Sequence, residues 1–224
     1  MEEEPTEPEP QPQSGFAQSG LVEFFNKGGN FMWALLVLAI IGLAVIIERA
    51  ITLQRAKADV KSLMERVVGA LKRGKYEEAV QICADTTGPI PQILHAGLRQ
   101  AKKGTVAVEK AIETAGIIEM SFLERGLIIL ATVANVAPLV GFLGTVSGMV
   151  SAFEAIAQAE QVSAKLVASG ISEALITTMT GLIIAVPTQI GHNLFVQRID
   201  RFVVEMEDSA AELVDTLATM ESGE

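Results

Sequence analysis

Three long apolar stretches constrain this chain more than any other feature of its sequence. They span residues 28–47, 126–153 and 166–197, and only the third contains ionisable side chains, Glu173 and His192. About 20 largely apolar residues are enough for a helix to cross the hydrocarbon core of a bilayer. Half of all residues are hydrophobic and only 5% are aromatic, a balance that is ordinary for helical membrane proteins. The sequence therefore predicts an all-α membrane protein with three transmembrane helices and long cytoplasmic helical extensions.

The basic residues indicate which side of the membrane each connecting segment faces. Of the 17 Lys and Arg, thirteen fall in the segment from Arg49 to Arg125, whereas only Lys165 lies between the second and third stretches. Lys and Arg collect near the cytoplasmic ends of membrane helices. We therefore expect the N-terminus and the second connection outside the cell, and the first connection and the C-terminus in the cytoplasm.

This interpretation divides the chain into seven segments. They are an acidic, Pro-rich disordered tail at 1–19, a periplasmic lead-in and first transmembrane helix at 20–48, a cytoplasmic helical domain at 49–124, the second transmembrane helix at 125–153, a short periplasmic loop at 154–166, the third transmembrane helix at 167–196, and a cytoplasmic amphipathic C-terminal helix at 197–224. The tail shows no basic start followed by an apolar run, so we expect no secretory signal in it. Its composition is too polar to bury enough surface for folding.

Helical patterns extend beyond the apolar stretches. Residues 50–74 continue the first transmembrane helix without Pro and stop at Gly74, a residue typical of helix ends. A helix that starts at Thr105 is expected to run uninterrupted into the second transmembrane helix. Residues 197–224 carry an apolar stripe at helical spacing, which predicts packing against other helices. Cys83 lies in a short amphipathic helix and is expected to be a small buried side chain.

Three glycines mark one face of the second transmembrane helix. Gly141, Gly144 and Gly148 lie within about 60° of one another on a helix, and small residues at such spacing let a second backbone approach closely. Their contact is either with another helix of the same chain, or with a second copy or around a pore. In the third helix, Gly181 and Pro187 are expected to form a packing or hinge position, since Pro removes a backbone hydrogen bond.

Hydroxyl and carboxyl groups inside the membrane stretches point to a polar pathway. From a helical rise of about 1.5 Å per residue, Thr145 and Thr178 are expected at nearly equal depth. Glu173 lies nearer the outer surface and shares a helix face with Thr177 and Thr180. A carboxylate inside a bilayer is costly, so Glu173 lines an ion path or a buried pair, or else it is an interfacial acid near the helix start. A membrane Thr commonly bonds to its own helix, so each hydroxyl alone is weak evidence.

The residue types indicate no catalytic or metal chemistry. The sequence has one Cys and two His that lie far apart, so no metal-ligand spacing is present. A phosphate-binding glycine loop and a nucleophile–base arrangement are missing as well. We therefore expect no enzyme activity, no metal, no cofactor and no nucleic-acid partner.

Two motifs carry a family resemblance. The stretch "PLVGFLGTVSGMVSAF", followed about twenty residues later by "ISEALITTMTGLIIAVPTQIGHNLF", resembles the ExbB/TolQ/MotA family of proton-channel motor subunits. The resemblance covers roughly residues 20–215. MotA-type subunits have an additional transmembrane helix, so the three expected here place the chain with the ExbB/TolQ branch.

The resemblance implies a function, a location and partners. It implies a pentamer in the bacterial inner membrane that encloses the single transmembrane helices of two copies of an ExbD/TolR-like partner. The partner's aspartate takes up and releases protons, and the partner transmits work to a TonB/TolA-like protein. The family's threonines match Thr145 and Thr178, and its glutamate matches Glu173, which makes these three residues the candidate proton pathway.

Two other functions stay open on the residues alone. One is a membrane scaffold whose cytoplasmic helices recruit a partner. The other is a self-contained transporter, which predicts a second charge partner inside the membrane and usually more transmembrane helices.

Overall fold

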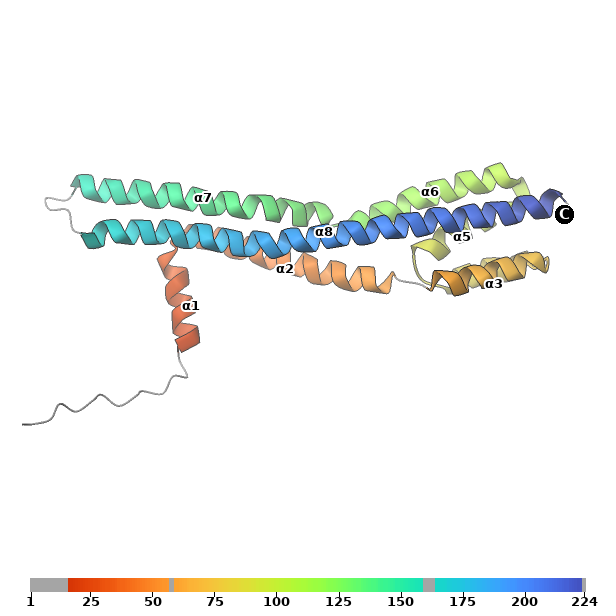
Figure 1. The fold of residues 1–224 in the computed structure, drawn as a ribbon, viewed down its shortest axis with the longest axis horizontal. Coiled ribbons are helices and arrows are strands. Elements are labelled where there is room, and N and C mark those ends of the chain that lie inside the picture. The colour runs from red at the N-terminus through yellow and green to blue at the C-terminus, as the bar shows by residue number, and fades with distance from the viewer. Residues whose placement is uncertain (1–15, 57–58, 159–163, 223–224) are drawn as a thin grey trace, which may run out of the picture. The chain divides into compact units, whose positions relative to one another are not determined.

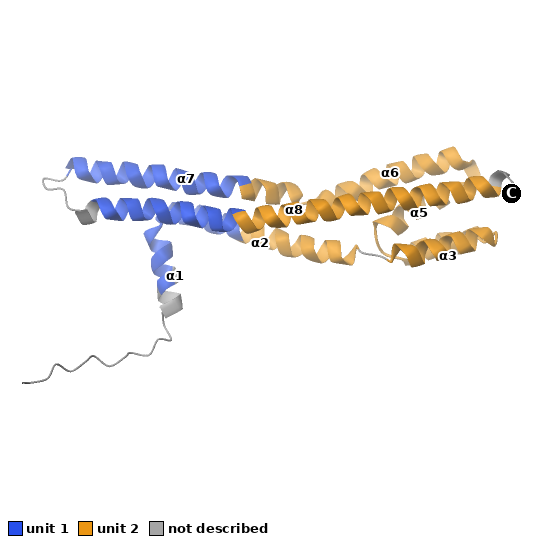
Figure 2. Cartoon of the chain, in the orientation of Figure 1, with its two compact units in different colours: residues 1–39, 135–185 blue, residues 40–134, 186–224 orange. Residues whose placement is uncertain are grey.

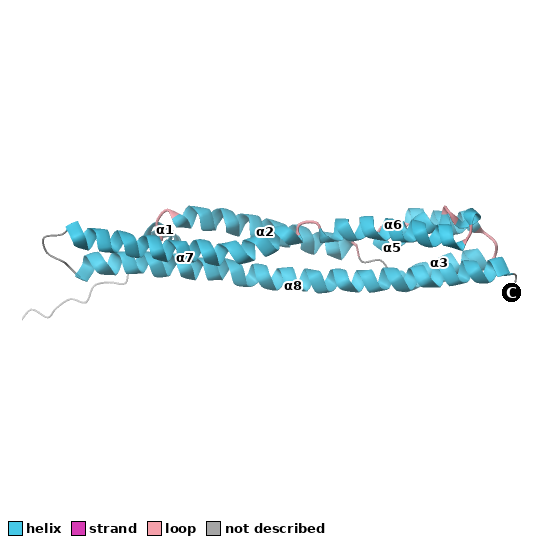
Figure 3. Ribbon diagram, turned by 90° about the horizontal axis from the view of Figure 1, so that it is seen from above, coloured by secondary structure: helices cyan, strands magenta, loops and turns pink. Residues whose placement is uncertain are grey.

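The computed structural model describes residues 16–56, 59–158 and 164–222, and the regular secondary structure in these ranges is entirely helical (Figures 1 and 3). Three helical stretches, carried by α2, α7 and α8, are long and apolar enough to cross a membrane, which confirms the predicted all-α membrane fold. The helices are α1 (Phe16–Lys27), α2 (Phe31–Arg55), α3 (Val60–Lys72), α4 (Tyr76–Asp85), α5 (Pro89–Leu98), the 3₁₀ helix η1 (Ala101–Lys103), α6 (Thr105–Glu124), α7 (Leu127–Gln158) and α8 (Ala164–Ser222).

The chain forms two compact units, each built from segments that are far apart in the sequence (Figure 2). Unit 1 comprises residues 1–39 and 135–185, and unit 2 comprises residues 40–134 and 186–224. The helices α2, α7 and α8 contribute residues to both units. The candidate pathway residues all belong to unit 1.

In unit 1, α7 and α8 run side by side, and α1 leads through a short turn into α2 (Figure 1). Met32 and Leu35 of α2 are buried in one cluster with Ala137 of α7 and Ala185 of α8. Side chains on the outer face of α2, such as Val37, are largely exposed. An exposed apolar face on a helix of this length is the arrangement expected of a helix that contacts lipid.

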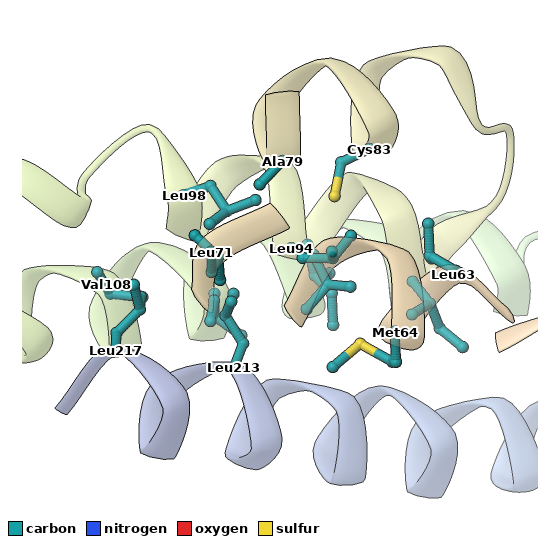
Figure 4. Packing of buried hydrophobic residues seen from close by; sticks show 14 of the residues in the cluster. Leu63, Met64, Leu71, Ala79, Cys83, Leu94, Leu98, Val108, Leu213 and Leu217 are labelled. Carbon is teal, nitrogen blue, oxygen red and sulfur yellow. The ribbon is translucent and has the colours of Figure 1, made fainter. Parts of the chain in front are cut away.

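The core of unit 2 joins α3, α4, α5 and α6 to the C-terminal part of α8 (Figure 4). Leu71, Leu94 and Leu213, from three of these helices, have no exposed surface. Burial of apolar area at about 25 cal/mol per Å² supplies most of the stabilisation of such a core. The apolar stripe predicted for residues 197–224 packs against other helices: Ile199, Phe202, Met206, Leu213 and Leu217 are buried, and Val203, Ala210 and Val214 are half-buried. Cys83 is also buried in this core, as predicted.

α6 and α7 are separate helices, so the expectation of an uninterrupted helix from Thr105 was wrong. Gly126, between them, has a φ of 90°, which lies in the left-handed region that glycine adopts without steric cost. The buried guanidinium of Arg49 donates hydrogen bonds to the carbonyl oxygens of Phe122 (3.5 Å) and Leu123 (3.3 Å). The last carbonyls of a helix lack partners within it, so Arg49 stabilises the C-terminal end of α6.

The ends of other helices also differ from the sequence-based expectation. α2 ends at Arg55, and α3 begins at Val60 after the carboxylate of Asp59 accepts a hydrogen bond from the backbone N–H of Ser62 at 3.3 Å. The first helix therefore does not continue to Gly74, although α3 does end just before that glycine.

Both segments expected to lack structure are partly helical. Residues 16–19, which the sequence assigned to the tail, form the first turn of α1, and the rest of that tail lies outside the described residues. In the segment predicted as a short loop at 154–166, residues 154–158 belong to α7 and residues 164–166 belong to α8, and the residues between them lie outside the described ranges.

Candidate functional site

The glycine face of α7 lies directly against α8. A Cβ on Gly141 would lie 2.9 Å from the carbonyl oxygen of Thr177, and a Cβ on Gly148 would lie 3.0 Å from that of Gly170. A Cβ on Gly144 would overlap the side chain of Thr177. Of the two contacts that the sequence left open, the structure therefore shows the one within the chain.

Gly181 makes the matching contact from the other helix. A Cβ at this position would lie only 2.6 Å from the carbonyl oxygen of Ala137 on α7. Glycines on both helices thus bring two backbones together without intervening side chains, which is how close helix contacts form in membranes. The packing function expected for Gly181 agrees with this geometry.

Thr178 uses this contact to form a hydrogen bond between the two helices. Its hydroxyl donates to the carbonyl oxygen of Gly141 at 3.1 Å, although the two residues are 37 positions apart in sequence. The missing side chain at Gly141 leaves its carbonyl open to a neighbouring helix. The Thr178 oxygen keeps its lone pairs, so it can still accept a hydrogen bond from another group.

Thr145 bonds within its own helix. Its hydroxyl donates to the carbonyl oxygen of Phe142 at 2.6 Å, and the residue is half-buried. Thr177 and Thr180 also donate to carbonyls of their own helix, those of Ala174 (2.9 Å) and Ile176 (2.8 Å). Thr178 therefore differs from the other three hydroxyls, and neither periodicity nor composition distinguishes it.

The two pathway threonines lie at similar heights. Gly144 packs on Thr177, Thr145 follows Gly144, and Thr178 follows Thr177 on the antiparallel helix. At a rise of about 1.5 Å per residue, the levels of Thr145 and Thr178 differ by about 3 Å. The structure does not bring their hydroxyls together in one bond, since each donates to a carbonyl oxygen.

Glu173 lies against the turn between α1 and α2. It is half-buried, and a Cβ added to Gly29 would overlap its Oε1 atom. Gly29 has a φ of 67°, and Gly28 beside it packs on Ile176 of α8. Since α8 already begins at Ala164, Glu173 is too far along to cap the start of its own helix.

The Glu173 carboxylate has no recorded hydrogen-bond donor or cation among the residues that the structure describes. Only its backbone carbonyl is used, as an acceptor for the Thr177 hydroxyl at 3.2 Å. A half-buried carboxylate in an apolar stretch needs a cation or a polar partner to offset its desolvation.

Pro187 lies inside α8, which continues from Ala164 to Ser222 on both sides of it. Helix α7 likewise contains Pro138 without ending there. The hinge functions expected for Gly181 and Pro187 stay predictions.

Other proteins are similar to this chain over these segments. Residues 85–208, more than half of the chain, match the model of the MotA/TolQ/ExbB proton channel family. The Tol-Pal system protein TolQ of Haemophilus influenzae is 30% identical over 222 residues, which cover 91% of this chain and 94% of that protein. TolQ of Pseudomonas aeruginosa is 28% identical over 183 residues, 77% of this chain and 79% of that protein. The biopolymer transport protein ExbB of Salmonella typhimurium is 37% identical over 93 residues, 42% of this chain and 38% of that protein.

Proposed function

Because the chain belongs to the MotA/TolQ/ExbB proton channel family, we propose that it is the proton-channel subunit of an energy-transducing motor in a bacterial inner membrane. The proposal is supported by relatives that are named as the TolQ protein of the Tol-Pal system and as the biopolymer transport protein ExbB. The distribution of Lys and Arg supports a periplasmic N-terminus and a cytoplasmic C-terminus. The chain provides a path for protons and catalyses no reaction.

The observation that carries this proposal is the hydrogen bond from Thr178 to Gly141 across the contact of α7 and α8. The O–H group of Thr178 donates to the carbonyl oxygen of Gly141, while the hydroxyl oxygen can still accept a hydrogen bond. A protonated carboxylic acid can therefore donate to Thr178, and a hydroxyl that rotates away from its carbonyl can donate to the ionised acid. Thr145, about 3 Å away in height, offers the same two options on the neighbouring helix.

The proton carrier is the aspartate of an ExbD/TolR-like partner with one transmembrane helix. The three apolar stretches of this chain contain only Glu173 and His192 as ionisable side chains, and Glu173 lies five residues, about 7.5 Å of helical rise, from Thr178. We therefore assign the acid beside the threonines to another chain. A pentamer of this chain around two partner helices would surround that acid with hydroxyls. Glu173 would stand at the outer entrance of the path.

The membrane potential supplies the energy. One proton that crosses the full field releases about 2.3 kcal/mol per 100 mV, to which any pH difference adds. The partner would pass this work to a TonB/TolA-like protein. Lipid would contact the exposed apolar face of α2.

Replacing the two threonines tests the pathway. Thr145→Val and Thr178→Val keep the side-chain shape but remove the hydroxyl, so we expect each to lower proton-driven envelope or uptake function by at least tenfold with normal membrane insertion. Thr132→Val is the matched control, because Thr132 is an exposed threonine of α7 that donates to the carbonyl oxygen of Ile128 in its own helix. Full function in both pathway variants, or equal loss in the control, would show that the hydroxyls carry no proton.

A further inference from the structure

A small cavity of about 310 Å³ lies in unit 2, between the C-terminal end of α2 and α8. One part of its wall is apolar and includes Leu53, Leu194 and Phe195. The other part is polar and includes Arg198 and Arg201. The cavity therefore joins a hydrocarbon-like wall to a pair of guanidinium groups.

The two arginines carry charge that the described part of the chain leaves unpaired. Neither forms an ion pair there, whereas Arg49 pairs with Glu48 and Arg73 pairs with Glu78. Arg198 and Arg201 also line a neighbouring cavity of about 1050 Å³ that includes carboxylates, but no carboxylate lies within 4.0 Å of either guanidinium. Arginines three positions apart lie on one helix face and can bind one anion together.

The cavity lies where the apolar surface of the helices ends. Leu194 and Val196 are exposed, and the first charged side chains after them are those of Arg198, Asp200 and Arg201. On α2, Ile51 is still exposed. This boundary is where lipid phosphates lie, and basic pockets between transmembrane helices on the cytoplasmic side bind anionic head groups.

We propose that Arg198 and Arg201 bind the phosphate of an anionic phospholipid from the cytoplasmic leaflet. The guanidinium N–H groups donate to the phosphate oxygens, as planar donor forks do in phosphate sites. One acyl chain lies along Leu53, Leu194 and Phe195. The site requires only that the chain spans a membrane, so it is independent of the proton pathway.

Lipid retention tests this site. The purified chain is placed in phosphatidylcholine nanodiscs with and without phosphatidylglycerol, and the lipids that stay bound are identified by native mass spectrometry. We expect wild type to retain phosphatidylglycerol. The amount of phosphatidylglycerol bound to Arg198→Gln/Arg201→Gln should be at least fivefold lower. The matched control, Arg66→Gln/Lys72→Gln, removes two exposed positive charges of α3 that do not line the cavity, and it should retain lipid as wild type does.

Two further measurements keep the test decisive. If the double variant does not insert into the membrane, Arg201→Gln alone replaces it, because Arg201 is exposed. This single variant should lose less phosphatidylglycerol than is expected of the double variant. Excess inorganic phosphate should leave the bound lipid in place. Equal lipid retention in wild type and the cavity variants, equal loss in the control, or displacement by phosphate would overturn the proposal.

Discussion

Glu173 is positioned by a glycine that no other residue can replace without moving it. Gly29 combines a positive φ with direct contact to the Glu173 carboxylate, so a side chain there meets both a backbone penalty and a steric overlap. Gly74 has a similar φ of 72°, but a Cβ there would meet nothing within 4 Å. Substitutions at these two glycines therefore separate the free-energy cost of backbone strain from the cost of the steric overlap with Glu173.

We expect Gly29→Ala to displace the carboxylate and to change the rate at which dicyclohexylcarbodiimide labels Glu173 by at least threefold. Gly74→Ala pays a comparable backbone cost of about 1–2 kcal/mol but leaves the labelling rate unchanged. Labelling is read by mass spectrometry of the peptide that contains Glu173. Identical rates in wild type and Gly29→Ala would show that the turn does not position this acid.

Cys83 should be an unreactive thiol. Burial raises its pKa from 9.0 to about 11. At pH 8 its thiolate fraction is then about 100-fold lower than in the unfolded chain, and alkylation should slow by a similar factor or more. The rate of iodoacetamide labelling, with and without denaturant, measures this ratio.

The same pKa predicts how stability depends on pH. The unfolded thiol loses its proton near pH 9.0 and the folded thiol near pH 11, so the unfolded state binds fewer protons between these values. The neutral thiol therefore makes its complete contribution to the free energy of unfolding below pH 9, and this contribution decreases as the pH rises to 11. In Cys83→Ala this decrease in the free energy of unfolding should be absent. An equal decrease in wild type and in the variant would contradict the raised pKa of Cys83.

At the level of single residues, the sequence located the glycine face and the membrane hydroxyls, but it did not predict their partners. The face of Gly141, Gly144 and Gly148 follows from helical periodicity alone. The partner of Thr178, the carbonyl of Gly141, does not, because the register between two helices depends on how both backbones pack. The contact of Glu173 with Gly29 could not be predicted for the same reason, because it joins a turn to a helix far along the chain.

At the level of helices, Arg49 stabilises the C-terminal end of α6. In the sequence, Arg49 is one of several basic residues near a membrane boundary. That pattern does not indicate that its side chain is buried. Its guanidinium reaches the carbonyl oxygens of Phe122 and Leu123, more than 70 positions away. Helix ends that depend on a distant side chain cannot be predicted from local propensity, whereas the end of α3, just before Gly74, could be predicted.

We expect Arg49→Gln to destabilise unit 2 by about 1–3 kcal/mol, because the carbonyl oxygen of Leu123 loses a charged donor in a buried hydrogen bond. Arg55→Gln is the control, since Arg55 is exposed at the end of the same helix. Thermal unfolding in detergent, together with the rate of proteolysis near Gly126, measures the effect. Equal stability of the two variants would show that the bonds from Arg49 contribute little.

At the level of the whole molecule, a chain whose apolar stretches contain only Glu173 and His192 as ionisable groups should not conduct protons alone. We expect no proton flux from liposomes that hold this chain by itself, and flux when a single-span partner with a membrane aspartate is added. A pH-sensitive dye inside the liposomes reports the flux after a potential is imposed. A partner with Asn in place of that aspartate is the control, and flux from the isolated chain would favour a self-contained transporter.

The glycine contact between α7 and α8 has a mechanical consequence. Each of these glycines lies directly against a carbonyl oxygen or a side chain of the other helix. A slide of one helix along the other would push larger side chains into space that only glycine leaves open. We therefore expect the two helices to move together as one stiff pair. In the proposed assembly, any rotation driven by protons would then occur between these helix pairs and the partner helices that they surround.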